Sequence, residues 1–125
     1  ASDVYKRQLE KGNEIYLNVF KALNDDYESY EMEYFKKMAE KQIVNGTRKW
    51  WEFNKILSSN INTETSLDGS QTHVTIDMPG RTPTEEERKD MWENRSFIDQ
   101  MMQKNGSASR EFVKRYNLKL VMWQF

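Results

Sequence analysis

The chain has 125 residues, and its 19 Lys and Arg nearly balance 20 Asp and Glu. It has no cysteine and one histidine, which excludes disulfide scaffolds, zinc–thiolate sites, cysteine nucleophiles and multi-histidine metal centres. No apolar run approaches the ~20 residues that cross a bilayer. With 37% hydrophobic and 13% aromatic residues, the composition predicts one packed domain of the α+β class.

The first eight residues, Ala1–Gln8, resemble the translated end of an adapter used in shotgun sequencing libraries. Such a segment is set aside in fold reasoning, which leaves residues 9–125 as the expected domain. The resemblance implies that the gene was cut before Leu9 and that the natural chain extends further upstream. It also implies an environmental source, a microbe or a virus.

Residues 9–43 are expected to form one long amphipathic helix. Apolar residues recur along it at spacings of three and four, as in an a/d heptad stripe: Tyr16, Phe20, Leu23, Tyr27, Tyr30 and Tyr34. Asn45 and Gly46 should end this helix, because both residue types tolerate a positive φ.

Shorter elements are expected after it: a helix over 48–58 and a hairpin with strands 61–67 and 71–78 about the turn Asp68-Gly69. Thr82, Pro83 and Glu85 are start signals for a helix over 83–104. A short helix ending near Tyr116 and a strand over 118–125 should complete a small antiparallel sheet. The expected core comprises Phe20, Leu23, Tyr27, Phe53, Leu57, Val74, Ile76, Trp92, Ile98, Phe112, Leu120 and Met122.

The C-terminal end is basic, with five Lys or Arg and one acid between Lys104 and Phe125. The segment Ser109–Leu118 resembles the first helix and turn of a helix-turn-helix. That resemblance implies nucleic-acid binding through Arg110, Lys114, Arg115 and Lys119. The alternative interpretation is a basic helix followed by a strand that closes the sheet.

Known catalytic signatures are absent from the sequence, which has no phosphate-binding loop, dinucleotide fingerprint, nucleophile elbow or HExxH motif. His73 and Asp77 lie four residues apart on an expected strand, ~13 Å along the chain, and are interpreted as a solvent-facing pair. We therefore expect no catalytic residue, no metal site and no cofactor, and the protein is not expected to be an enzyme.

The leading functional hypothesis is a small interaction or structural module, such as a viral or phage accessory or assembly protein. It would bind a protein partner or a second copy through the aromatic helix stripe, with Tyr16, Phe20, Tyr27, Tyr30 and Tyr34 as contacts. The alternative is a nucleic-acid-binding accessory protein that uses the basic C-terminal end. A third hypothesis is a fragment of an enzyme whose active site lies upstream. Under each of the three hypotheses we expect a cytoplasmic protein that does not contact a membrane.

Overall fold

The computed structural model describes residues 12–58 and 69–122. Within these ranges one antiparallel sheet has the strand order β2-β3-β1-β4. The strands are β1 (Glu14–Ala22), β2 (Arg48–Lys55), β3 (His73–Pro79) and β4 (Arg110–Lys119). The helices are α2 (Tyr27–Tyr30), the π-helical turn η1 (Glu31–Phe35), α3 (Lys36–Asn45), α4 (Glu85–Trp92) and α5 (Phe97–Ala108). The predicted α+β class is confirmed.

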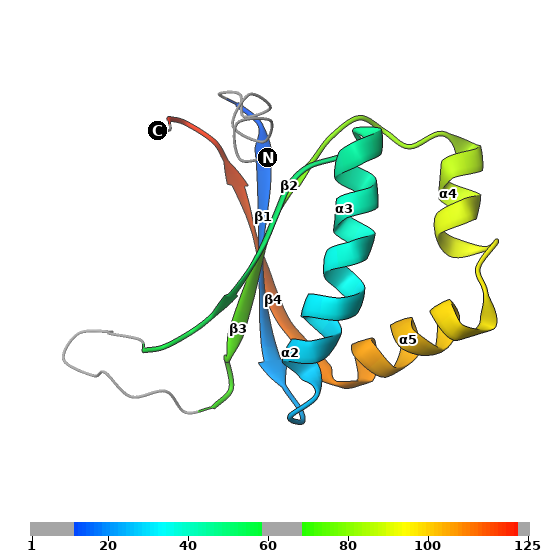
Figure 1. Cartoon of the computed structure of the whole chain (residues 1–125). Helices are drawn as coiled ribbons and strands as arrows, with labels where there is room; N and C mark the ends of the chain where they lie inside the picture. The colour runs from blue at the N-terminus through cyan, green and yellow to red at the C-terminus, as the bar shows by residue number, and fades with distance from the viewer. Residues whose placement is uncertain (1–11, 59–68, 123–125) are drawn as a thin grey trace.

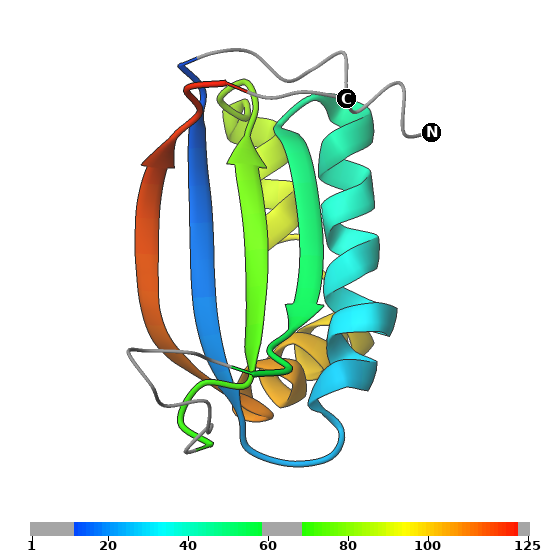
Figure 2. The same ribbon diagram turned by 90° about the vertical axis from the view of Figure 1, so that its left-hand side faces the viewer.

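The helices lie on one face of the sheet (Figure 1), and Figure 2 shows the other face with no helix in front of it. The elements follow one another as β-α-β-β-α-β, which is the split β-α-β topology, with two helices in the second crossover. The two central strands, β1 and β3, therefore present side chains to the helices on one face only. This arrangement leaves a space between sheet and helices for the site described below.

The predicted long N-terminal helix is wrong, because residues 14–22 form β1 and the continuous helix runs only from Tyr27 to Asn45. Tyr16 and Phe20 are four residues apart, a spacing that shares a face in a strand as well as in a helix. Their neighbours Ile15 and Val19 are β-branched and favour a strand. As a central strand, β1 pairs with both β3 and β4, which decides the conformation.

The middle of the chain also differs from the prediction. Residues 48–55 form β2 instead of a helix, and they pair with β3. The predicted strand 71–78 is confirmed as β3, whereas the predicted strand 61–67 lies outside the described residues. The end of the first helix is confirmed, since α3 stops at Asn45 and Gly46 has a φ of 86°.

The predicted helix 83–104 is divided into α4 and α5 by the segment 93–96. Thr84, not Thr82, caps α4 and forms a capping box with Glu87. The predicted end at residue 104 is also wrong, since α5 continues to Ala108 through Gly106. Gly106 is instead a packing position, because an added Cβ would lie 3.0 Å from Phe35 Cε2.

The predicted helix-turn-helix is not formed, because the segment that resembled it is the edge strand β4. The predicted short helix ending near Tyr116 is absent for the same reason. The strand predicted over 118–125 is also misplaced, since β4 ends at Lys119 and residues 120–122 are not in a strand, while 123–125 lie outside the described residues. Pairing with nine residues of β1, from Glu14 to Ala22, fixes this segment as a strand despite its five charged side chains.

Tyr27 is the centre of the packed core and has no exposed surface. Its ring lies 5.6 Å from that of Phe53 and 4.9 Å from that of His73, with both contacts edge-on, and 6.3 Å from that of Phe20. Of the other expected core residues, Phe20 is buried, and Phe53, Val74, Ile76 and Leu120 are half-buried. The remaining six are exposed, namely Leu23, Leu57, Trp92, Ile98, Phe112 and Met122.

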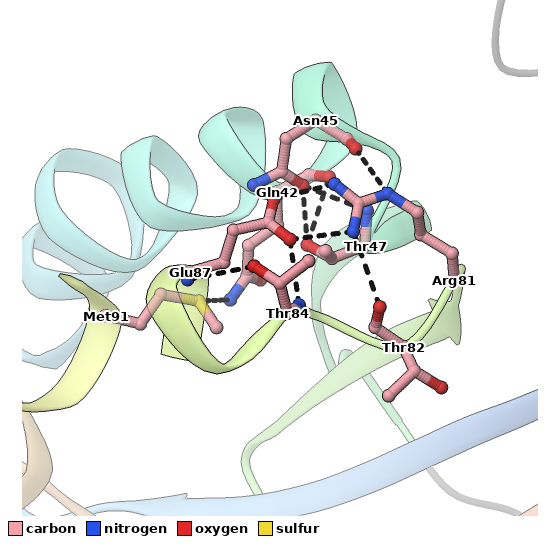
Figure 3. A network of polar contacts seen from close by, with 8 residues as sticks. All are labelled: Gln42, Asn45, Thr47, Arg81, Thr82, Thr84, Glu87 and Met91. Atoms are coloured by element: carbon pink, nitrogen blue, oxygen red, sulfur yellow. Dashed lines mark hydrogen bonds and ion pairs between the residues drawn. The ribbon is translucent and has the colours of Figure 1, made fainter. Parts of the chain in front are cut away.

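A polar network ties α4 to the end of α3 (Figure 3). Arg81 donates two hydrogen bonds to Glu87, at 2.7 and 2.6 Å, and a third to the backbone carbonyl of Asn45 at 3.1 Å. Gln42 Nε2 lies 3.0 Å from Met91 Sδ. Because α4 has no buried residue of its own, these contacts hold it beside the end of α3.

Candidate functional site

A cavity of about 520 Å³ lies between the sheet and the helices. All four strands contribute to it through Asn18, Phe20, Arg48, Trp51, Thr75, Asp77, Arg110, Phe112 and Arg115. The helices contribute Glu31, Phe35, Met38, Trp92, Gln103 and Ser107. The volume falls in the range of small-molecule sites, which extends from ~300 to ~1,000 Å³.

The cavity has an open end and a closed end. Phe112 and Trp92 are 54% and 55% exposed, and Arg115 and Ser107 are exposed as well, so these residues form the mouth beside β4. Asn18, Thr75 and Glu31 are buried and form the closed end. The mouth thus holds two large apolar side chains in contact with solvent, and the interior is polar.

A row of hydrogen-bonded side chains crosses the sheet along the cavity floor. Arg48 Nη1 donates to Asp77 Oδ1 at 2.6 Å, and Asn18 Nδ2 donates to Asp77 Oδ2 at 2.9 Å. Arg115 Nε in turn donates to Asn18 Oδ1 at 2.7 Å. The row joins β2, β3, β1 and β4 in order of their position in the sheet, so the backbone holds each group in place.

Burial dominates the electrostatics of this row. It raises the pKa of Asp77, an effect that the Arg48 and Arg115 guanidinium groups oppose. It likewise lowers the pKa of Arg48, which the charge of Asp77 opposes. These opposing effects show that the charges are partly desolvated and depend on one another.

A second polar group closes the inner end. Tyr27 donates from its hydroxyl to Glu31 Oε1 at 2.9 Å, and Arg110 Nη1 donates to the same oxygen. The Arg110 guanidinium lies between the rings of Phe20 and Phe35, 4.3 and 4.1 Å from their centroids. Glu31 Oε2 is buried and has no hydrogen-bond partner in the described residues, and burial raises the pKa of Glu31.

The π-helical turn η1 explains how Glu31 and Phe35 reach the same cavity. A π-turn widens the helix to an i→i+5 hydrogen-bond pattern, so residues four apart fall on nearly one side. Such turns are frequent at functional sites. Here the turn brings both the Glu31 carboxylate, which accepts a hydrogen bond from Arg110, and the Phe35 ring into contact with the Arg110 guanidinium.

Another cavity, of about 420 Å³, lies between α3 and the α4–α5 pair. Its charged lining is almost balanced, with three basic and four acidic residues. Arg95 and Glu87 of this lining are already paired with Asp99 and Arg81. The sheet–helix cavity has the more specific chemistry and is the candidate site.

The residues of the predicted aromatic stripe do not lie along one helix. Tyr16 and Phe20 are on β1, Tyr27 and Tyr30 on α2, and Tyr34 on η1. Three of them, Phe20, Tyr27 and Tyr34, are buried within the chain. Partner binding through this set stays a prediction, but the continuous surface on which it was based is not formed.

The four predicted nucleic-acid contacts all lie on β4. Arg110 and Arg115 line the cavity, whereas the Lys114 ammonium lies 5.0 Å from the centre of the Tyr116 ring. The interpretation of His73 and Asp77 as a solvent-facing pair is also wrong, and Asp77 belongs to the row on the cavity floor. His73 is 4% exposed, and its Nε2 lies 2.8 Å from Glu28 Oε1.

Most of this site was not predicted from the sequence. Asn18 was not singled out, Glu31 was assigned to no site, and Asp77 was considered only as the neighbour of His73. One signal was available: Asn18 stands among the apolar residues of 15–20, where a polar side chain in a central strand needs a partner.

Comparison of the chain with protein-family models, curated proteins and solved structures finds no match. No helix in residues 12–58 and 69–122 combines the length and apolarity needed to cross a membrane. Within the same ranges, no three His, Asp or Glu side chains are grouped so as to hold a metal ion.

Proposed function

We propose that the protein binds a small organic molecule in the sheet–helix cavity. The observation that carries the proposal is the floor of the cavity, where Arg48, Asp77, Asn18 and Arg115 form a hydrogen-bonded row across four strands. Ligand sites are usually concave, mostly apolar, and supplied with a few polar groups that are held in place. The cavity is concave, has aromatic side chains in its lining, and carries on its floor polar groups that are held in place.

The arrangement supports binding better than it supports a structural role alone. A packed core fills its interior to a density near that of organic crystals, with few voids larger than a water molecule. The sheet–helix cavity instead leaves about 520 Å³ beside its charged floor, a space that a ligand can enter from the mouth. This proposal differs from the leading hypothesis of the sequence analysis, which was a protein partner or a second copy bound through the aromatic stripe.

The test uses nuclear magnetic resonance of the whole chain with phenol, benzamide and benzoate as separate probes. The side chains of Trp51 and Trp92 line the cavity, so their indole N–H signals should shift together on saturable binding. Trp50 is the internal control. Trp50 precedes Trp51 directly in β2, where it is paired with Met78. Successive side chains of a strand point to opposite faces, so Trp50 points away from the cavity.

A blocking variant separates cavity binding from surface binding. Ser107→Phe places a ring at the mouth and should abolish the shifts. Asn105→Phe, at an exposed position of the same helix that does not line the cavity, should leave them unchanged. The proposal fails if no probe shifts Trp51 and Trp92, or if the two variants behave alike.

A further inference from the structure

We propose that the natural ligand is an aromatic carboxylate that carries a single negative charge. This inference rests on the proposed binding function and adds the chemical class of the ligand. It is argued from the charges of the lining, the unused hydrogen-bond donors and the apolar mouth.

The charge of the lining favours a monoanion. Three arginines line the cavity, Arg48, Arg110 and Arg115, against the two carboxylates Glu31 and Asp77. The lining thus has one positive charge in excess, and protonation of either carboxylate would increase the excess. A single carboxylate neutralises it, whereas a dianion such as a phosphate monoester would leave one negative charge in excess.

The geometry of Arg115 favours a carboxylate in particular. Within the described residues its hydrogen bond to Asn18 uses Nε, and its guanidinium lies over the Tyr16 ring, 4.7 Å from the centroid. In the part of the chain that the structure describes, its two terminal nitrogens form no hydrogen bond and can receive a ligand. Such a fixed guanidinium edge matches the two oxygens of a planar carboxylate, which it binds through paired hydrogen bonds.

The side chains at the mouth of the cavity favour a ligand with an aromatic ring. Phe112 and Trp92 remain more than half exposed although they are large and apolar. Phe112 is already packed edge-on against Phe20, with ring centroids 5.7 Å apart, which fixes its ring. A flat ligand ring entering beside Phe112 and Trp92 would cover both, and aromatic pairs gain more than their buried area alone provides.

The experiment compares benzoate with benzamide, which has the same ring and shape but no charge. Dissociation constants are measured by the Trp51 and Trp92 indole shifts at neutral pH and low salt. We expect benzoate to bind at least tenfold more tightly than benzamide. Phenyl phosphate, a dianion, should bind more weakly than benzoate.

Two variants on β4 test the role of Arg115. Arg115→Met should reduce benzoate affinity at least tenfold and leave benzamide affinity unchanged. Lys114→Met removes the same charge one residue away, at a side chain that lies over Tyr116 and does not line the cavity, and should have little effect. Thermal unfolding of both variants checks that each is folded.

The outcomes separate this inference from the function on which it rests. Equal binding of benzoate and benzamide, blocked by Ser107→Phe, would overturn the carboxylate assignment and leave the binding function standing. Equal losses in Arg115→Met and Lys114→Met would also overturn it, because a general charge effect would then explain the affinity. Failure of all probes to bind would overturn both.

Discussion

Asn18 Nδ2 on β1 donates a hydrogen bond of 2.9 Å to Asp77 Oδ2 on β3. Asn18 is only 4% exposed, and its amide also donates to Thr75 Oγ1 at 3.2 Å and accepts from Arg115. One side-chain amide on a central strand thus forms hydrogen bonds with three neighbouring side chains. The stability of the sheet and the shape of the candidate site depend on the same side chain.

Replacement of Asn18 by Leu should lower the free energy of unfolding by about 1–3 kcal/mol, because a partly buried carboxylate loses a donor. Urea unfolding measures the change. Asn54→Leu is the matched control at an exposed position of β2 and should stay within about 0.5 kcal/mol of the parent. Equal effects of the two replacements would contradict the importance of the Asn18–Asp77 bond.

Two replacements of Tyr27 should separate the contribution of its ring to the free energy of unfolding from the contribution of its hydroxyl. Tyr27→Ala removes a fully buried ring and should cost about 3–5 kcal/mol, whereas Tyr27→Phe removes only the hydrogen bond to Glu31 and should cost about 1 kcal/mol. Chemical denaturation again provides the measurement. Leu57→Ala, at a side chain that is 85% exposed, should change little, and a comparable loss there would contradict the assigned core.

Gly80 is predicted to tolerate no side chain. A Cβ at this position would lie 2.1 Å from the carbonyl oxygen of Gly46, on the backbone that connects α3 to β2. Gly80→Ala should therefore lower the free energy of unfolding by at least about 3 kcal/mol. This is as large as, or larger than, the usual loss when a group is added to a packed site. Thermal or urea unfolding measures the loss.

The matched control is Gly69→Ala. Gly69 has a φ of 82° but no atom within 4 Å of an added Cβ, so only the backbone conformation is strained, at about 1–2 kcal/mol. If Gly80→Ala proved no more destabilising than Gly69→Ala, the close approach of Gly80 and Gly46 would be refuted.

The Arg81–Glu87 pair should give the protein a defined acid sensitivity. Hydrogen bonds from Arg81 lower the pKa of Glu87 from 4.5 to about 2. A lowered folded-state pKa means that the stabilisation is fully present above the unfolded pKa and is lost as the pH falls through about 2. The difference in unfolding free energy between the parent and Glu87→Gln should thus be constant above pH ~4.5 and shrink below it.

Urea titrations between pH 7 and pH 2 measure this difference. Glu86→Gln serves as the control, since Glu86 is exposed on the same helix and forms no ion pair among the described residues. A stability difference for Glu87→Gln that did not change with pH would show that the Arg81–Glu87 contact does not form in solution.

The sequence by itself determined the features that depend on local chemistry. Alternation of Val74, Ile76 and Met78 with polar residues predicted β3, and a glycine that tolerates positive φ ended α3 at Gly46. A threonine followed by glutamates placed the start of α4 within two residues. These signals act over a few residues and need no distant partner.

The tertiary structure alone decided the conformations of 14–22, 48–55 and 110–119. Tyr16 and Phe20 satisfy a helical spacing and a strand alternation equally, and only pairing with β3 and β4 selects the strand. The site follows the same rule. Arg48, Asn18, Asp77 and Arg115 come from four separate parts of the chain, and only the order of strands in the sheet makes them neighbours.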